Sequence, residues 1–254
     1  MYSDDITKIS AAAHLKSQFL AQSKLKYLLS SALAGMYVGF GILLIFTIGG
    51  LLAQDGSPLV RIVMGLCFGI ALSLVIMAGS ELFTGNNLIM TIGLYEKKVQ
   101  ISQFMTIHLL SFLGNLAGSI VIAWLFVLAG LAQGSTAMFI QKIAQVKMTL
   151  SVTELLARGI LCNMLVCLAL WCSFRMKEEA GKLIMVFWCL FAFITTGYEH
   201  SVANMTLLAA ALMIPGGAGL SMTGFWYNLG VVSLGNFIGG ALFVGSSYWY
   251  ISKK

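Results

Sequence analysis

Long apolar runs constrain this chain more than any other feature. A helix needs about 20 mostly apolar residues to cross a bilayer, and six runs of roughly that kind can be read along the chain. They cover 27–53, 59–78, 104–132, 155–174, 183–196 and 224–251. Since 59% of the 254 residues are hydrophobic and only 9% are charged, too little polar surface exists to cover a water-soluble globule. The sequence therefore predicts an all-α membrane protein with six transmembrane helices.

Residues 1–26 differ from the rest of the chain. They carry acidic and basic side chains and lack the uninterrupted apolar stretch of a cleavable signal peptide. We expect an amphipathic N-terminal helix that lies on the cytoplasmic surface of the membrane. The predicted division is 1–26 as this surface helix and 27–254 as a single transmembrane channel domain.

The 15 basic residues set the expected orientation. Eleven fall on one side of the predicted spans: Lys8, Lys16, Lys24, Lys26, Lys97, Lys98, Arg175, Lys177, Lys182, Lys253 and Lys254. The other four are Arg61, Lys142, Lys147 and Arg158. The positive-inside rule then places both termini in the cytoplasm, in a multi-pass protein of the cytoplasmic (inner) membrane. The net charge of +6 reflects this topology, and no soluble segment carries the clustered basic face that a nucleic-acid partner requires.

The first three spans and the last three repeat one another. Glu81 is followed five residues later by Asn86, and Glu199 is followed in the same way by Asn204. Leu-Gly-Asn at 113–115 matches Leu-Gly-Asn at 234–236, and each copy continues into a GxxxG face that allows close helix approach. The same alignment pairs Gly35 with Gly159.

An odd number of spans per copy makes the second copy enter the membrane from the opposite side. The chain is therefore predicted to be an inverted 3+3 repeat, with repeat one at 27–132 and repeat two at 151–251. Inverted repeats with a solute path at their interface are a recurring plan of transporters.

Glu81 and Glu199 are the only acidic residues at membrane depth. Glycine, serine and threonine surround both, so we expect spans two and five to break there and to continue as half-helices beginning near Gly85 and Val202. Their N-terminal amides would offer partial positive charge to an anion at the midplane. The glutamates either face the solute or hold the loops by accepting backbone amide bonds, and we favour the second role. His200, the only histidine at a break, is expected to face the solute.

Five strings carry a resemblance to the formate/nitrite transporter family. They are GSELFTGN (79–86), LGNLAGS (113–119), LCNMLVCLALW (161–171), GYEHSVANM (197–205) and LGNFIGGALFVGSSYW (234–249). Together they are most similar to the nitrite-channel branch of a family that also holds hydrosulfide channels. The resemblance implies an aquaporin-like protomer with its own pore, assembled as a homopentamer, without a cofactor or metal.

The resemblance also implies roles for individual residues. Leu82, Thr84 and His200 would form the pore gate and selectivity point. Phe68, Leu72, Val166 and Phe193 would narrow the pore. Asn163 would offer a polar contact beside the fourth-span constriction, and Lys147 would attract anions on the extracytoplasmic side. Glu81, Glu199 and Asn204 would hold the break loops.

The predicted function is therefore a channel or transporter for small monovalent anions of weak acids, with transient protonation at His200. The resemblance implies that a formate-type member would carry aspartate at position 81 and serine at position 85, where this chain has Glu81 and Gly85. Nitrite, formate and hydrosulfide all stay open, because all three are small, monovalent conjugates of weak acids. A water or neutral-solute channel is one alternative, but its paired Asn-Pro-Ala turns are missing. An intramembrane enzyme built on Glu199 and His200 is another, without a recognisable metal set or activated nucleophile. We do not expect an enzyme.

Overall fold

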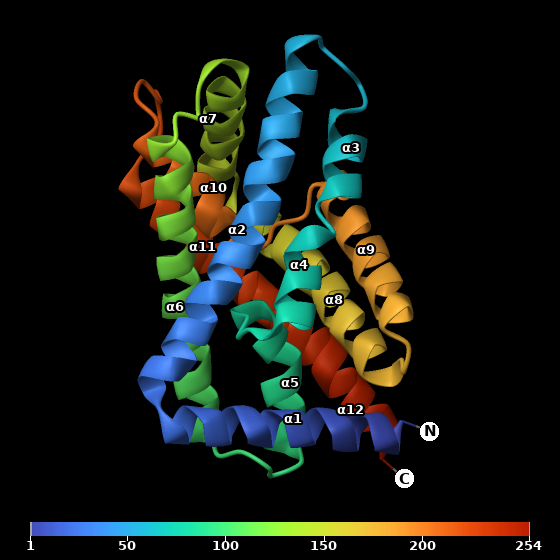
Figure 1. Ribbon diagram of the computed structural model, residues 1–254. Helices are drawn as coiled ribbons and strands as arrows, with labels where there is room; N and C mark the ends of the chain where they lie inside the picture. Colours follow the sequence, from blue (N-terminus) through green and yellow to red (C-terminus); the bar gives the residue numbers. More distant parts are fainter. Residues whose placement is uncertain (1, 254) are drawn as a thin grey trace.

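The computed structural model describes residues 2–253, and in that part of the chain all regular secondary structure is helical. Six helical segments are long and apolar enough to cross a membrane (Figure 1). Their bounds are Lys24–Gln54, Val60–Gly79, Ile101–Leu128, Val152–Arg175, Glu179–Thr196 and Met222–Ser252. The predicted all-α fold with six spans is confirmed, and the protein is a multi-pass membrane protein.

Spans two and five are broken, as predicted. Span two is made of α3 (Val60–Cys67), α4 (Ile70–Leu74) and a π-helical turn (Val75–Gly79), and it ends where Gly79 adopts a φ of +77°. The chain then runs extended into the half-helix α5 (Phe83–Tyr95). Span five is α9 (Glu179–Thr196), which ends at Gly197 with a φ of +82°, before the half-helix α10 (Ser201–Met213). Glycine is required at both stops because other residues rarely adopt a positive φ.

The GxxxG faces bring pairs of spans into close contact. The third span, α6 (Ile101–Leu128), packs on the first span, α2 (Lys24–Gln54). The sixth span, which starts as α11 (Met222–Phe237), packs on the fourth, α8 (Val152–Arg175). A Cβ at Gly118 would lie 1.9 Å from the carbonyl oxygen of Ala32, and one at Gly239 would lie 2.2 Å from that of Ile160. Any larger residue at these positions would force the helices apart.

These contacts correct one detail of the internal alignment. Gly114 packs on Ser31 in the first copy, and its counterpart Gly235 packs on Gly159 in the second. The equivalent of Gly159 is therefore Ser31, one helical turn before Gly35. Hydropathy could not distinguish the two registers because both helices are apolar over several turns.

Each copy also has a lead-in helix. The helix α1 (Ser3–Gln22) lies across the end of the bundle where the termini are found (Figure 1). The helix α7 (Gly134–Thr149) lies between the two predicted repeats and packs on α2, α10 and α11. The sixth span finishes as a π-helical turn (Ile238–Ser246) and the short α12 (Ser247–Ser252), which contacts α1.

Candidate transport path

Three cavities follow one another through the bundle. The first, which we name the arginine vestibule, has a volume of about 500 Å³ and includes Arg61, Lys147, Arg158 and Glu199 in its lining. The second, the α1 vestibule, has a volume of about 360 Å³ and includes Lys16 and Glu81. The third, the central cavity, lies between them at His200 and has a volume of about 10 Å³. A space of that size holds about one water molecule.

The central cavity is almost entirely apolar. Its lining comes from both copies and consists of Val38, Phe68, Ala71, Leu72, Leu82, Val166, Leu190, Phe193 and His200. The Phe68 and Phe193 rings meet edge to face, with centroids 5.6 Å apart. All four residues expected to narrow the pore therefore line this cavity, together with Leu82 of the expected gate. Their effect on flux stays a prediction.

The two breaks meet at a single polar contact. Thr84, in the first turn of α5, and His200, the residue before α10, lie with Oγ1 and Nε2 3.0 Å apart. The backbone N–H of Ala203 donates to Nδ1 of His200 at 3.1 Å. Because a backbone amide can only donate, Nδ1 must be unprotonated, and the ring proton of the neutral imidazole lies on Nε2, directed at Thr84. The structure thus brings together the three residues of the expected gate.

Each break loop carries one glutamate, and its carboxylate is paired with a lysine of a lead-in helix. The Glu81 carboxylate accepts hydrogen bonds from Lys16 Nζ at 2.6 Å and from Tyr27 Oη at 2.7 Å. In the second copy, Glu199 accepts from Lys147 Nζ at 2.7 Å and from Asn204 Nδ2 at 2.6 Å. The glutamates were expected to accept backbone amides, and that detail is wrong, since within residues 2–253 the donors to both carboxylates are side chains.

Two asparagines make the hydrogen bonds to the break-loop backbone that were expected of the glutamates. Asn115 donates through Nδ2 to the Glu81 carbonyl at 2.9 Å and accepts from the Phe83 N–H at 2.8 Å. Asn236 donates to the Glu199 carbonyl at 2.9 Å and accepts from the N–H of Ser201, also at 2.9 Å. The matched Leu-Gly-Asn strings at 113–115 and 234–236 carry the signal for this role, in their asparagines as well as in their glycines.

These contacts limit what the half-helix ends offer to an anion. Asn115, Asn236 and the His200 ring already accept from the backbone amides of Phe83, Ser201 and Ala203. The expectation that the N-terminal amides stand free for solute is wrong for these three groups. The direction of each helix dipole is unaffected.

The polar pore contact expected of Asn163 stays a prediction. Asn163 is fully buried and lines none of the three cavities described above. Its Nδ2 donates to the Thr84 carbonyl at 3.2 Å, while its Oδ1 accepts from Asn87 Nδ2 at 2.6 Å. Asn163 therefore fastens α8 to α5 behind the gate, because both ends of its amide are engaged there.

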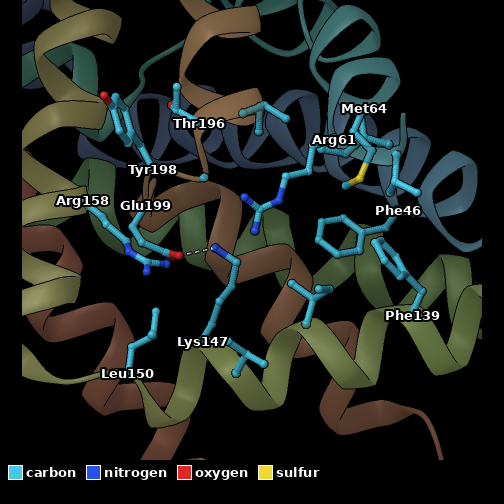
Figure 2. A pocket seen from close by; sticks show the side chains of 16 residues that line it. Phe46, Arg61, Met64, Phe139, Lys147, Leu150, Arg158, Thr196, Tyr198 and Glu199 are labelled. Carbon is cyan, nitrogen blue, oxygen red and sulfur yellow. Dashed lines mark hydrogen bonds and ion pairs between the residues drawn. The ribbon is translucent and has the colours of Figure 1, made fainter. Parts of the chain in front are cut away.

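Figure 2 shows the charged groups of the arginine vestibule. Lys147, the expected anion attractor, is tied to Glu199, whose side chain is 2% exposed, so the pair is close to neutral. Arg61 and Arg158 line the same cavity. In the sequence, both arginines indicate only orientation, and Lys16 resembles a surface charge. Their grouping depends on helix packing that no local pattern reveals.

Six spans, two broken helices and a narrow apolar centre between two charged vestibules define a channel-type transport protein. The sequence model of the formate/nitrite transporter family matches residues 4–250. The chain belongs to the formate/nitrite transporter family, as the motifs predicted.

Known relatives agree with this assignment. The nitrite transporter NirC of Escherichia coli (strain K12) is 44% identical over 256 residues, which cover 100% of this chain and 94% of the relative. A solved FNT family ion channel superposes with a TM-score of 0.93 at 41% identity and covers 99% of this chain and 100% of its own. A pentameric formate channel with formate bound gives a TM-score of 0.81 at 27% identity, covering 92% and 99%. These proteins are transporters and channels, which disfavours the enzyme alternative.

Proposed function

We propose that this protein passes small monovalent anions of weak acids across the cytoplasmic membrane, with nitrite as the principal solute. The observation that carries the proposal is the apolar central cavity, interrupted only by the Thr84–His200 contact, between two vestibules that each hold a lysine–glutamate pair. The similarity to a nitrite transporter over the whole chain supports nitrite ahead of formate and hydrosulfide.

The size of the central cavity requires movement during transport. A space of about 10 Å³ admits one water at most, so Leu82, Phe68 or Phe193 must shift before an anion passes. An unaccompanied charge is costly in such surroundings. The wall offers one polar side chain, His200, with Thr84 behind it, and the solute has to be stabilised there.

Transient protonation at His200 is the second part of the proposal. The Nε2 proton points along the Thr84 contact, while Nδ1 holds the first turn of α10. Charging the ring at Nδ1 removes the acceptor of the Ala203 amide. We therefore expect an imidazolium at this site to be short-lived, which suits a ring that takes up a proton from water, passes a proton to a weak-acid anion and so returns to the neutral form.

Assembly and orientation form the third part. We propose a homopentamer with one pore per protomer, supported by the similarity to a pentameric formate channel. The unequal distribution of basic residues supports both termini in the cytoplasm, with the arginine vestibule on the outer side. On this view residues 1–26 form a cytoplasmic helix and residues 27–254 the channel domain.

Flux in proteoliposomes tests the proposal. Purified protein is reconstituted with a pH reporter inside, and nitrite, formate and hydrosulfide are added separately, with empty liposomes as the control for passive entry. We expect the three anions to enter faster than the control, and the His200→Asn variant to change the pH dependence of entry. A profile unchanged by this substitution removes protonation at His200 from the mechanism. Osmotic swelling without any anion flux would favour the water-channel alternative instead.

A further inference from the structure

The arginine vestibule holds two cationic side chains that the pore machinery does not use. Arg61 forms no ion pair within residues 2–253. Arg158 has a single long contact, 3.8 Å to Glu154, between side chains that are 39% and 50% exposed. Exposed pairs of this kind contribute little. Lys147, by contrast, is committed to buried Glu199 at 2.7 Å, so the cations available to a solute in this cavity are the two arginines.

Both arginines are placed against the second break loop. Arg61 lies in the first turn of α3, and its guanidinium comes within 3.7 Å of the position that a Cβ on Gly197 would occupy. The carbonyl oxygen of Arg158 accepts the N–H of Glu199 at 3.2 Å, which anchors this part of α8 to the same loop. Figure 2 shows both guanidinium groups within the cavity, with the Lys147–Glu199 pair between them in this view. An anion held here lies close to the entrance of the central constriction.

We propose that Arg61 and Arg158 form a capture site for planar oxyanions with two oxygen atoms, and that this site favours nitrite and formate over hydrosulfide. The inference rests on the proposed function and specifies its solute class. A guanidinium presents parallel N–H groups that match two oxygens of one anion, whereas an ammonium acts as a point charge. Hydrosulfide has one sulfur acceptor and cannot offer a separate acceptor atom to each of the two parallel N–H groups.

The site is suited to capture and not to tight binding. Both arginines are partly exposed and screened by solvent, so each contact is weak and a held anion leaves readily. A path that conducts needs this balance, because a solute must be attracted and then released. The oxygen preference therefore belongs to the entrance, whereas the apolar centre selects for size and charge.

Conservative variants separate the shape of the guanidinium from its charge. Arg61→Lys and Arg158→Lys keep the positive charge and lose the pair of parallel N–H groups. Lys142→Gln is the control, because it removes an exposed charge on α7 that does not line the vestibule. Initial rates are measured against concentration in oriented proteoliposomes, for nitrite, formate and hydrosulfide, with empty liposomes as background. Size-exclusion chromatography of each variant checks that it is folded and assembled.

We expect Arg61→Lys and Arg158→Lys to raise the half-saturation concentration for nitrite and formate about three- to tenfold, with hydrosulfide changed less than twofold. Lys142→Gln should leave all three values unchanged. Equal shifts for hydrosulfide and nitrite, or no shift for nitrite in either arginine variant, would overturn the capture site. Wild-type protein that carries none of the three anions would instead refute the proposed function, so the two failures are distinct.

Discussion

Replacing Lys147 with methionine tests whether this lysine holds the pore or attracts the solute. Methionine keeps most of the unbranched stem and removes the ammonium that lies 2.7 Å from the Glu199 carboxylate. The Glu199 side chain is only 2% exposed and that of Lys147 is 17% exposed. The substitution therefore leaves a carboxylate without its counter-charge in a site almost closed to water.

The magnitude follows from this burial. Removing one partner of a buried ion pair costs about 3–5 kcal/mol. Glu199 retains the hydrogen bond from Asn204 at 2.6 Å, so we expect the lower end, about 3 kcal/mol. For a chain of this size, 1 kcal/mol corresponds to roughly 2–4 °C in Tm. Lys147→Met should therefore lower the Tm of the purified protein by about 6–12 °C.

A second substitution provides the control. In Lys147→Met/Glu199→Gln the unpaired charge is gone and a glutamine can still accept from Asn204, so most of the lost stability should return. The Tm is measured by intrinsic fluorescence in detergent, and nitrite flux is measured in parallel. A single variant with wild-type Tm and reduced flux would refute this reasoning and favour anion attraction by Lys147 itself.

Three further predictions concern other parts of the fold. Asn236→Leu should destabilise the second break loop by about 2–4 kcal/mol, since it leaves the Ser201 amide and the Glu199 carbonyl without buried partners, and a Tm measurement checks it. Gly118→Leu should prevent α6 from packing on α2, where a Cβ would lie 1.9 Å from a carbonyl oxygen, and yield of folded protein after extraction is the readout. The pKa of Glu96 is lowered, chiefly by its hydrogen bond from Lys253. The contribution of Glu96 to stability is therefore present above the ordinary carboxyl pKa and is lost as pH falls through the lowered pKa of the folded state. Acid should then alter the fluorescence of Trp249, whose indole N–H also donates to Glu96. Glu96→Gln should remove this acid response, and an identical response in that variant would contradict the assignment.

Much of the fold could be predicted from the sequence because the bilayer imposes simple rules. Apolar runs of span length identify membrane helices, and an odd number of spans per copy makes the repeat inverted. Glycine beside an intramembrane glutamate marked both breaks, which the structure places after Gly79 and at Gly197. These are local signals, each carried by a few adjacent residues.

Which side chains meet depends on the packing of the helices. Lys16 and Glu81 are far apart in the sequence, as are Thr84 and His200, and nothing local pairs them. The position of Asn163 behind the gate was likewise decided by the way α8 packs on α5. The six spans and the two breaks could be predicted without the fold, because hydropathy and backbone freedom are properties of short segments. Helix packing determined which polar groups face solute and which bond to one another, because an unpaired polar group is costly in an apolar interior and several partners were within reach.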